Sequence, residues 1–319
     1  MTFGYGPATQ PDGWSDAVLS NKESADCLIP MGITSENVAA DYGITRTQQD
    51  AFAANSFQKA AAAAKAGRFR DEITPLKVNW VDPKSEQVRE ITVSADDGIR
   101  DGVTAEGLAK LKPAFKKDGG THAGNASQIS DGAAAVLLAR RSTAKRLGLP
   151  IVGKFVSAAV AGVPPRVMGI GPAVAIPKVL EQTGLKTGDV EFFEINEAFA
   201  SQAVYSIEKL GLPYEKVNLN GGAIAIGHPL GMSEFLPCLR TAERPVDHFL
   251  PDSRCAPNRH WLEHRKADRK AHLCDEHVHR FGHGNGCCIR ERALSGKGLF
   301  LCKPLMSSRA SVLLTSSIP

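Results

Sequence analysis

The spacing of apolar and polar residues along the chain predicts a long helix near the start. Thr45-Arg-Thr-Gln48 has the capping-box pattern, in which a Thr and a Gln three residues later satisfy each other's backbone donors. An Ala-rich stretch runs from Gln48 to Ala66, and Gly67 follows it as a C-terminal stop. We therefore expect one helix over this stretch.

Further along, the pattern alternates between strands and helices. Two strands, Ile73–Val78 and Val88–Val93, are expected on either side of a polar turn at Asp82-Pro83. The small apolar run 132–138 is typical of a buried strand. Additional strands are expected at 151–160 and 190–195, and helices at 142–147, 172–184 and 199–210. This alternation favours an α/β layered domain after about residue 129, whereas the preceding region is expected to be more irregular and rich in loops.

Composition narrows the possible functions. The 319 residues are enough for two domains, and 43% hydrophobic with 23% charged residues is ordinary for a soluble globular protein. The net charge of +4 suits an anionic ligand such as a phosphorylated cofactor, but it is too small to argue for nucleic acid. No apolar run approaches the roughly 18 residues that a membrane span requires.

The average composition hides a break in the chain. Residues 1–231 contain one cysteine, Cys27, and two histidines, His122 and His228, whereas residues 232–319 contain six cysteines and seven histidines. The composition of a single domain does not explain this step. We therefore interpret the chain as two segments of different origin, joined near Gly231.

Four loops rich in small residues stand out, at 124–132, 168–172, 196–200 and 220–231. Glycine allows the backbone to approach a ligand closely, although each loop alone is more simply interpreted as a tight surface turn. His228 lies on a constrained turn, which suits acid–base or oxyanion chemistry. Taken alone, a purely structural histidine is an equally good interpretation.

Together, these loops resemble the thiolase family. Two signatures are matched by Asn196-Glu-Ala-Phe and by Gly221-Gly-Ala-Ile-Ala-Ile-Gly-His-Pro-Leu-Gly, and further stretches by 111–115, 124–127 and 31–37. The run Asp26-Cys-Leu-Ile-Pro-Met resembles the peroxisomal 3-ketoacyl-CoA branch of the family. The resemblance covers residues 1–231.

The resemblance implies an α/β, thiolase-like fold that is incomplete in this chain. Residues 1–128 would form the loop domain, and 129–148 the end of the N-terminal domain. Residues 149–231 would form part of the C-terminal domain. Residues 232–319 are expected to be an out-of-frame or intron-derived tail.

The resemblance also implies acyl transfer between coenzyme A thioesters in fatty-acid β-oxidation. In the family, one cysteine takes the acyl group and a second moves a proton at the α-carbon. A histidine activates the nucleophile and, with a water held by an asparagine, forms an oxyanion hole. By the motif match, His228 takes the histidine role and Asn196 the asparagine role.

The substrates implied are coenzyme A and acyl-CoA, with no further cofactor and no metal. The motif match places Met31, Ser127 and Phe199 against the pantetheine or the acyl pocket, and Arg100 near the nucleotide end. The family also implies a homodimer and a peroxisomal parent protein, with no nucleic-acid partner. A targeting signal is not found in the chain, which leaves a cytoplasmic location open.

Neither catalytic cysteine of the family is expected in this chain. The counterpart of the nucleophile would precede the point that matches Met1, and Cys27 belongs to a different stretch. The Cys-Ile-Gly motif of the second cysteine has no counterpart in the tail. We therefore expect little or no thiolysis. Two alternative functions are a non-catalytic CoA-binding or dimer-modulating fragment and a zinc-binding protein.

Three interpretations of the tail compete. The soft ligands between Cys274 and Cys288 suggest a zinc module, and a natural disordered tail is the second possibility. A wrong reading frame is the third and is favoured, because Asp275–Glu291, back-translated and read one base later, gives a Cys-Ile-Gly motif typical of the family. Residues 232–254 match neither frame, which favours a retained intron over a simple indel. We expect residues after about 232 to be poorly ordered, because such a sequence was never selected to pack.

Overall fold

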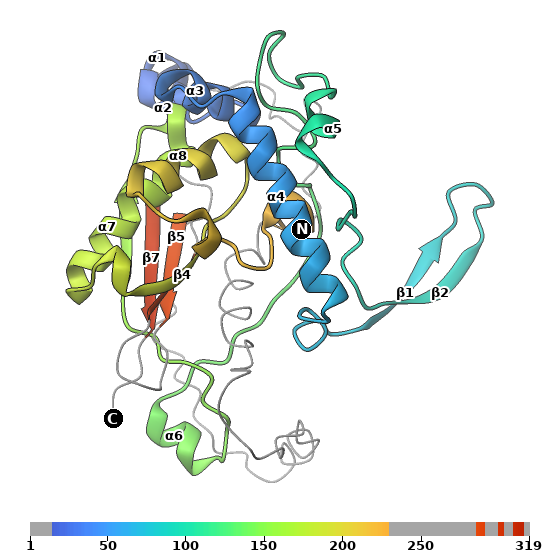
Figure 1. Cartoon of the computed structure of the whole chain (residues 1–319), viewed down its shortest axis with the longest axis vertical. Helices are drawn as coiled ribbons and strands as arrows, with labels where there is room; N and C mark the ends of the chain where they lie inside the picture. Colours follow the sequence, from blue (N-terminus) through green and yellow to red (C-terminus); the bar gives the residue numbers. More distant parts are fainter. Residues whose placement is uncertain (1–14, 230–284, 291–298, 303–308, 316–319) are drawn as a thin grey trace. The chain divides into compact units, whose positions relative to one another are not determined.

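The computed structural model describes residues 15–229, 285–290, 299–302 and 309–315 (Figure 1), all of them in one unit of the chain. The helices are α1 (Asp16–Ser20), α2 (Lys22–Asp26), α3 (Met31–Tyr42), α4 (Arg46–Lys65), α5 (Ala105–Ala109), α6 (Arg141–Arg146), α7 (Gly171–Thr183), α8 (Ala200–Leu210) and α9 (Ala223–Ile226). Short 3₁₀ helices are η2 (Pro165–Ile170), η3 (Thr187–Asp189) and η4 (Tyr214–Lys216). The strands are β1 (Leu76–Val81), β2 (Val88–Val93), β3 (Ala158–Gly162), β4 (Val190–Glu194), β5 (Asn285–Arg290), β6 (Leu299–Cys302) and β7 (Arg309–Thr315).

The larger sheet has the strand order β3-β7-β5-β6-β4. β4 pairs in parallel with β6, and β3 pairs antiparallel with β7. Three strands of this sheet, β5, β6 and β7, come from the part of the chain after residue 232, which we expected to be poorly ordered. The rest of the tail, including the proposed junction near Gly231, lies outside the described residues.

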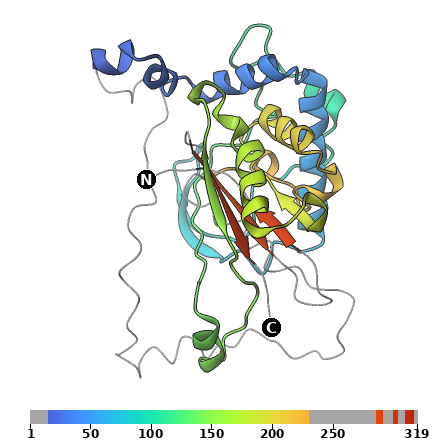
Figure 2. The same ribbon diagram turned by 90° about the vertical axis from the view of Figure 1, so that its left-hand side faces the viewer.

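Helix α7 lies over one face of the sheet (Figure 2). Its buried side chains form part of the hydrophobic core. It contacts β3, β5 and β7, and its buried residues Ile176 and Val179 join a cluster that includes Phe193 of β4 and Ile207 of α8. The chain leaves α7 through Gly184, whose φ of 69° is left-handed and therefore favours glycine. The sheet and its helices confirm the α/β layering that the sequence predicted after about residue 129.

The structure confirms the capping box predicted at the start of helix α4 and the glycine predicted to end it. The Thr45 side chain accepts from the Gln48 amide, the Gln48 side chain accepts from the Thr45 amide, and Gly67 has a φ of 70°. One face of α4 is buried against α5, α8 and α9, with Phe57 only 4% exposed. This helix therefore provides the support on which the later loops rest.

Three details differ from the prediction. Residues 132–138 form no strand, and Leu137 and Leu138 are 69% and 74% exposed, because nothing in the described part packs over them. The strand expected at 151–160 is limited to β3, which ends at Gly162. The region expected to be irregular contains α3, a 12-residue helix with a weakly amphipathic sequence that hides the helical period.

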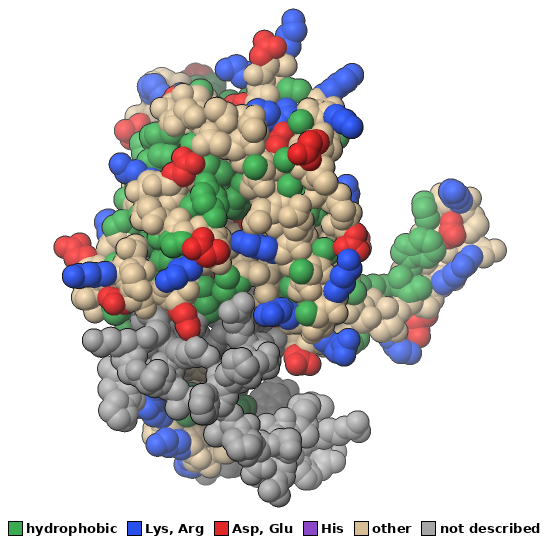
Figure 3. Space-filling model, in the orientation of Figure 1, with side chains coloured by type: hydrophobic (Ala, Val, Ile, Leu, Met, Phe, Trp, Pro, Cys, Tyr) green, Lys and Arg blue, Asp and Glu red, His purple; other side chains and the backbone are tan. Residues whose placement is uncertain are grey.

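The strands β1 and β2 form an antiparallel hairpin that projects from α4 (Figure 1), close to the predicted bounds. Every residue of both strands is exposed, and apolar side chains gather on the hairpin (Figure 3). Leu76 pairs with Val93 and Val78 with Ile91, so one face of the hairpin is apolar. Within the described ranges, no helix is both long enough and apolar enough to cross a membrane.

Candidate functional site

The four small-residue loops predicted from the sequence meet in the structure. The Ser127 amide donates to the Ala198 carbonyl at 2.9 Å, and Ala126 forms an antiparallel bridge with Phe199. The His228 amide donates to the Gln128 carbonyl at 3.1 Å. These contacts tie the loop 124–130 to the loop that carries Asn196 and to the loop that carries His228.

The fourth loop, 168–172, is connected to the loop that carries Asn196 through Gln202 of α8. The Gln202 amide group donates to the Asn196 carbonyl at 3.1 Å. A Cβ on Gly169 would lie 2.8 Å from the Gln202 side chain, so only glycine fits at this position without a shift. The backbone of Asn196 is thus held from the side of α7 and α8.

His228 and Asn196 form a buried pair at the centre of these loops. The Asn196 Nδ2 atom lies 3.2 Å from His228 Nε2, and the two residues are 1% and 5% exposed. An amide nitrogen can only donate, so this contact requires an unprotonated Nε2 on the imidazole. A neutral imidazole with an acceptor nitrogen can take a proton from a nucleophile.

The other polar atom of the Asn196 side chain, Oδ1, is buried and has no hydrogen-bond partner in the structure. Leaving a buried acceptor unpaired costs about 1–3 kcal/mol, so native structures satisfy most such atoms with protein groups or with water. Asn196 therefore offers an acceptor for a small donor, such as one water, directly beside the imidazole. A water held there would place a donor next to the imidazole, which is compatible with oxyanion chemistry.

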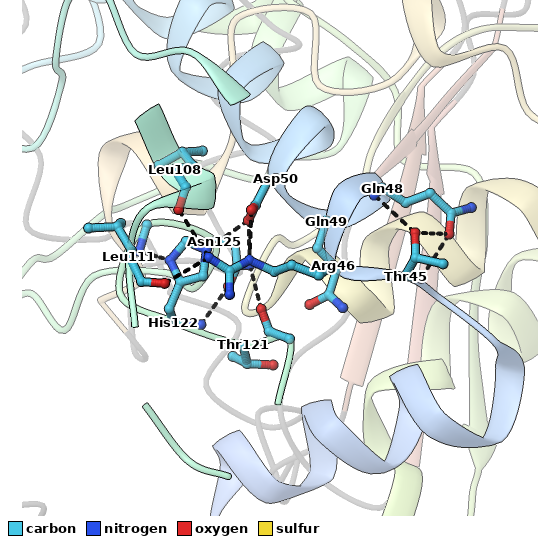
Figure 4. A network of polar contacts seen from close by, with 12 residues as sticks. Thr45, Arg46, Gln48, Gln49, Asp50, Leu108, Leu111, Thr121, His122 and Asn125 are labelled. Atoms are coloured by element: carbon cyan, nitrogen blue, oxygen red, sulfur yellow. Dashed lines mark hydrogen bonds and ion pairs between the residues drawn. The ribbon is translucent and has the colours of Figure 1, made fainter. Parts of the chain in front are cut away.

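A buried ion-pair network supports the loop that carries Ser127 (Figure 4). Asp50 of α4 accepts from His122 Nε2 at 2.7 Å, from Asn125 Nδ2 at 2.9 Å and from Arg46 Nε at 2.7 Å. The Gly124 amide donates to His122 Nδ1 at 3.0 Å, so the neutral tautomer with hydrogen on Nε2 satisfies both ring nitrogens. Burial lowers the pKa of His122, although the hydrogen bond with Asp50 opposes that shift.

The structure brings together two of the predicted substrate residues. Phe199 is 8% exposed, and its ring meets Phe115 edge to face with centroids 6.3 Å apart. Ser127 is half-buried and lies on the adjoining segment. A Cβ on Gly32 would lie 2.2 Å from the Phe115 ring, so the start of α3 also borders this aromatic pair.

The other two predicted substrate residues, Met31 and Arg100, lie apart from Phe199 and Ser127. The Met31 side chain is half-buried and packs on a separate cluster that includes Val163 and Met168. Arg100 is exposed, and its loop is tied to the site through Gly98, whose carbonyl accepts from Gln128 Nε2 at 3.2 Å. In the described part of the chain, Met31 and Arg100 are therefore connected to the His228–Asn196 site through their neighbours Gly32 and Gly98.

Two residues at the centre of the site were not singled out from the sequence. Gln128 connects three loops through its carbonyl and its side chain. Glu197, next to Asn196, is 1% exposed and holds the start of α9. The signal that could have identified Glu197 was the presence of polar residues, among them two glutamates, inside the largely apolar run 192–200.

Among the described residues, no group of three or more His, Cys, Asp or Glu side chains could hold a metal ion. The zinc interpretation depends on the segment from Cys274 to His279, which lies outside those residues, and on Cys287 and Cys288, which belong to β5. Cys27 is exposed at the end of α2, where its Sγ lies 3.3 Å from the Glu23 carbonyl. These observations give no support to Cys27 as a residue of the His228 site.

Two family models match the sequence. The model described as "Thiolase, N-terminal domain" matches residues 7–142, and the model described as "Thiolase, C-terminal domain" matches residues 149–238. Together they extend over most of the chain, and the residues they match include His228 and Asn196. The matches thus include all the loops that resemble the family, and the second one ends a few residues after the junction expected near Gly231.

Individual relatives agree with the family match. The peroxisomal 3-ketoacyl-CoA thiolase of Yarrowia lipolytica is 61% identical over 231 residues, which cover 72% of this chain and 55% of that protein. The peroxisomal 3-ketoacyl-CoA thiolase of Homo sapiens is 61% identical over 221 residues, covering 69% and 52%. The crystal structure of the dimeric peroxisomal thiolase of Saccharomyces cerevisiae has a TM-score of 0.66 at 52% identity, covering 74% and 58%. The chain spans about half the length of the curated relatives that it matches.

Proposed function

Because the chain belongs to the thiolase family, we propose that it is part of a peroxisomal-type 3-ketoacyl-CoA thiolase. Such an enzyme transfers acyl groups between coenzyme A thioesters in fatty-acid β-oxidation. The similarity to peroxisomal 3-ketoacyl-CoA thiolases from fungi, plants and mammals supports this assignment. The same relatives support a peroxisomal parent protein, and the dimeric yeast neighbour supports a homodimer.

Within that function, His228 is the base and Asn196 completes the oxyanion hole. A neutral imidazole deprotonates a thiol, and the resulting thiolate attacks the thioester carbonyl. The developing oxyanion then needs fixed donors, which a protonated imidazole and a water bound to Asn196 Oδ1 would provide. The observation that carries the proposal is the buried His228–Asn196 contact of 3.2 Å beside an unpaired acceptor.

Coenzyme A would lie over the loops that border this pair. Phe199 and Ser127 would contact the pantetheine or the acyl group, since both lie on the joined loops 124–130 and 196–199. Met31 at the start of α3 would border the same pocket. The exposed guanidinium of Arg100 would meet the phosphates of the nucleotide end.

The domain organisation that we propose follows the family. Residues 1–128 form the loop domain, 129–148 close the N-terminal domain, and 149–231 belong to the C-terminal domain. The N-terminal family match ends at residue 142 and the C-terminal match begins at residue 149, which supports a domain junction between these two residues. The wrong-reading-frame origin of the tail remains our proposal for residues 232–319.

Calorimetric titration of the pure chain with coenzyme A tests the binding part of the proposal. We expect measurable binding that weakens about tenfold or more in Phe199→Ala, because a buried aromatic contact of this size is worth at least about 1.4 kcal/mol. Trp80→Ala, on the projecting hairpin, is the matched control and should leave the affinity unchanged. No heat of binding at millimolar coenzyme A, or equal losses in both variants, would contradict the proposal.

An assay of thiolysis with acetoacetyl-CoA tests the catalytic part. The reaction requires a thiolate, and Cys27, the one cysteine of residues 1–231, is exposed at the end of α2. We therefore propose that the pure chain binds coenzyme A without turnover, as a CoA-binding or dimer-modulating fragment would. Robust thiolysis by the pure chain would overturn this part and leave the family assignment intact.

A further inference from the structure

We infer that Glu197 is a positioning residue that fixes the backbone leading to His228 and so sets the imidazole against Asn196. The inference rests on the proposed function only for its consequence in acyl transfer. Its structural content concerns contacts that the chain makes by itself. Glu197 directly follows Asn196, and α9 directly precedes the Gly227–His228 turn.

The Glu197 carboxylate accepts hydrogen bonds from three different parts of the chain. Ser56 Oγ of α4 donates to Oε2 at 2.6 Å, and Asn218 Nδ2 donates to Oε1 at 2.7 Å. The amide of Ile224, in α9, donates to Oε2 at 3.2 Å. A carboxylate with three donors and 1% exposure is fixed in one orientation, because any rotation would break bonds to a buried charge.

Ser56 also connects Glu197 to Gly222, the residue directly before α9. Its hydroxyl donates to Glu197 and accepts from the Gly222 amide at 3.0 Å. Gly222 lies directly against the carboxylate, since a Cβ at this position would be 2.2 Å from Glu197 Cδ. Two backbone amides at the start of α9 are therefore held, one directly and one through a hydroxyl.

Asn218 connects the same carboxylate to the strand before Asn196. Its side chain accepts from the Ile195 amide at 2.7 Å and donates to the Ile195 carbonyl at 2.8 Å. Asn218 has a φ of 47°, a left-handed conformation that asparagine tolerates better than most residues. Glu197 thus links both sides of the His228–Asn196 pair, because one group of bonds reaches α9 and the other reaches Ile195.

Lys59 supplies a positive charge that interacts with this buried group. It is half-buried on α4, one turn after Ser56, and donates to the carbonyls of Tyr214 and Val217. Burial lowers the pKa of Lys59, and the negative charge of Glu197 opposes that shift. Lys59 thus lies close enough to Glu197 for the two charges to attract each other.

The test compares Glu197→Gln with Glu36→Gln. Glu36 is also a buried glutamate, 6% exposed, and accepts from the amides of Gly120 and Thr121 at 3.0 and 2.8 Å, away from α9. Both changes remove one charge and one acceptor, so both should lower the thermal midpoint. Only a positioning role predicts a local effect at α9 and His228.

Two readouts follow the local effect in the full chain. Hydrogen exchange should speed up by about tenfold or more at the amides of Gly222 and Ile224 in Glu197→Gln only, because each charge-assisted bond is worth about 1.5–3 kcal/mol. The His228 ring proton signal, identified by its loss in His228→Asn, should shift in Glu197→Gln and stay in place in Glu36→Gln. Ser56→Ala, a milder change, should alter both readouts in the same direction by a smaller amount.

Two results would overturn the inference. One is an unchanged His228 signal and unchanged exchange at α9 in a folded Glu197→Gln or Ser56→Ala. The other is an equal response in Glu36→Gln, which would indicate general loosening of the fold. Failure of the wild-type chain to bind coenzyme A would instead count against the proposed function, and these readouts would still report on Glu197.

Discussion

Two segments of this chain have nearly the same kind of sequence and opposite environments. Residues 132–138, Gly-Ala-Ala-Ala-Val-Leu-Leu, have no regular structure, and Leu138 is 74% exposed. Residues 221–227, Gly-Gly-Ala-Ile-Ala-Ile-Gly, contain α9, and Ile224 is fully buried. Both are short runs of small apolar residues between glycines and polar residues, so apolar composition alone does not determine burial.

The difference lies in the polar groups that surround each segment. The backbone around α9 bonds to Glu197 and Ser56, and its side chains pack on Phe57 of α4. Because a backbone can be buried only if its amides and carbonyls find partners, these contacts make the burial possible. Most side chains of 132–138 remain exposed, and only Ala134 and Val136 are half-buried, since the described residues offer the run little packing surface.

The largest expected difference between such environments is in the cost of removing one apolar side chain. Phe193→Ala deletes a fully buried ring from β4 and should lower the free energy of unfolding by about 3–5 kcal/mol. Leu138→Ala removes a mostly exposed side chain and should change it by less than about 0.5 kcal/mol. Urea unfolding of both variants measures the contrast. Equal losses would mean that 132–138 is packed in solution and would end the comparison.

A smaller effect is expected from an added methyl group beside Glu197. Gly222→Ala should lower the free energy of unfolding by about 1–3 kcal/mol, because its Cβ would overlap the Glu197 carboxylate. Backbone strain does not contribute, since Gly222 has a φ of −133°, which alanine also adopts. Gly188→Ala is the matched control, since a Cβ there meets nothing within 4 Å, and it should be neutral or slightly stabilising. A neutral Gly222→Ala would show that Glu197 can move aside, which would weaken the account of α9.

Most regular elements were predictable because their signals are local. The capping box before α4, the glycine after α7 and the alternation in β2 each depend on residues a few positions apart. The exposed run 132–138 was wrongly predicted as a buried strand, because whether an apolar run is buried depends on distant parts of the chain. The pairing of β5–β7 with β3 and β4 was missed for the same reason.

The site shows the same limit. The pair His228 and Asn196 was predicted from motifs that carry both residues, and the structure places the two side chains in contact. Glu197 was passed over although it lies in the same motif, because its partners Ser56 and Asn218 are 141 and 21 residues away. A sequence pattern identifies residues that share a motif, whereas partners so far apart in the chain become visible only in the fold.

The buried histidine of the Asp50 network gives a pH-dependent test of the buried region. Burial lowers the folded-state pKa of His122 below the ordinary value of 6.5, so the unfolded chain binds the proton more readily. The stability that the fold gains by keeping His122 neutral is therefore complete above about pH 6.5. It is lost as the pH falls towards the folded-state pKa. Between pH 7.5 and 5.5, the unfolding free energy of the wild type should fall more steeply than that of His122→Gln. Parallel pH profiles of the two proteins would contradict this.

The smallest effect is expected on the exposed side of the comparison, at the ion pair of the hairpin. Lys77 Nζ lies 2.8 Å from Glu90 Oε1, but the two side chains are 72% and 61% exposed. Because water solvates both charges and holding two long side chains costs entropy, Lys77→Ala should lower the unfolding free energy by less than about 0.5 kcal/mol. A double-mutant cycle with Glu90→Ala isolates the coupling between the two charges. A coupling well above that value would mean that the hairpin is shielded from water in solution, so that its apolar face, like α9, has a packing partner.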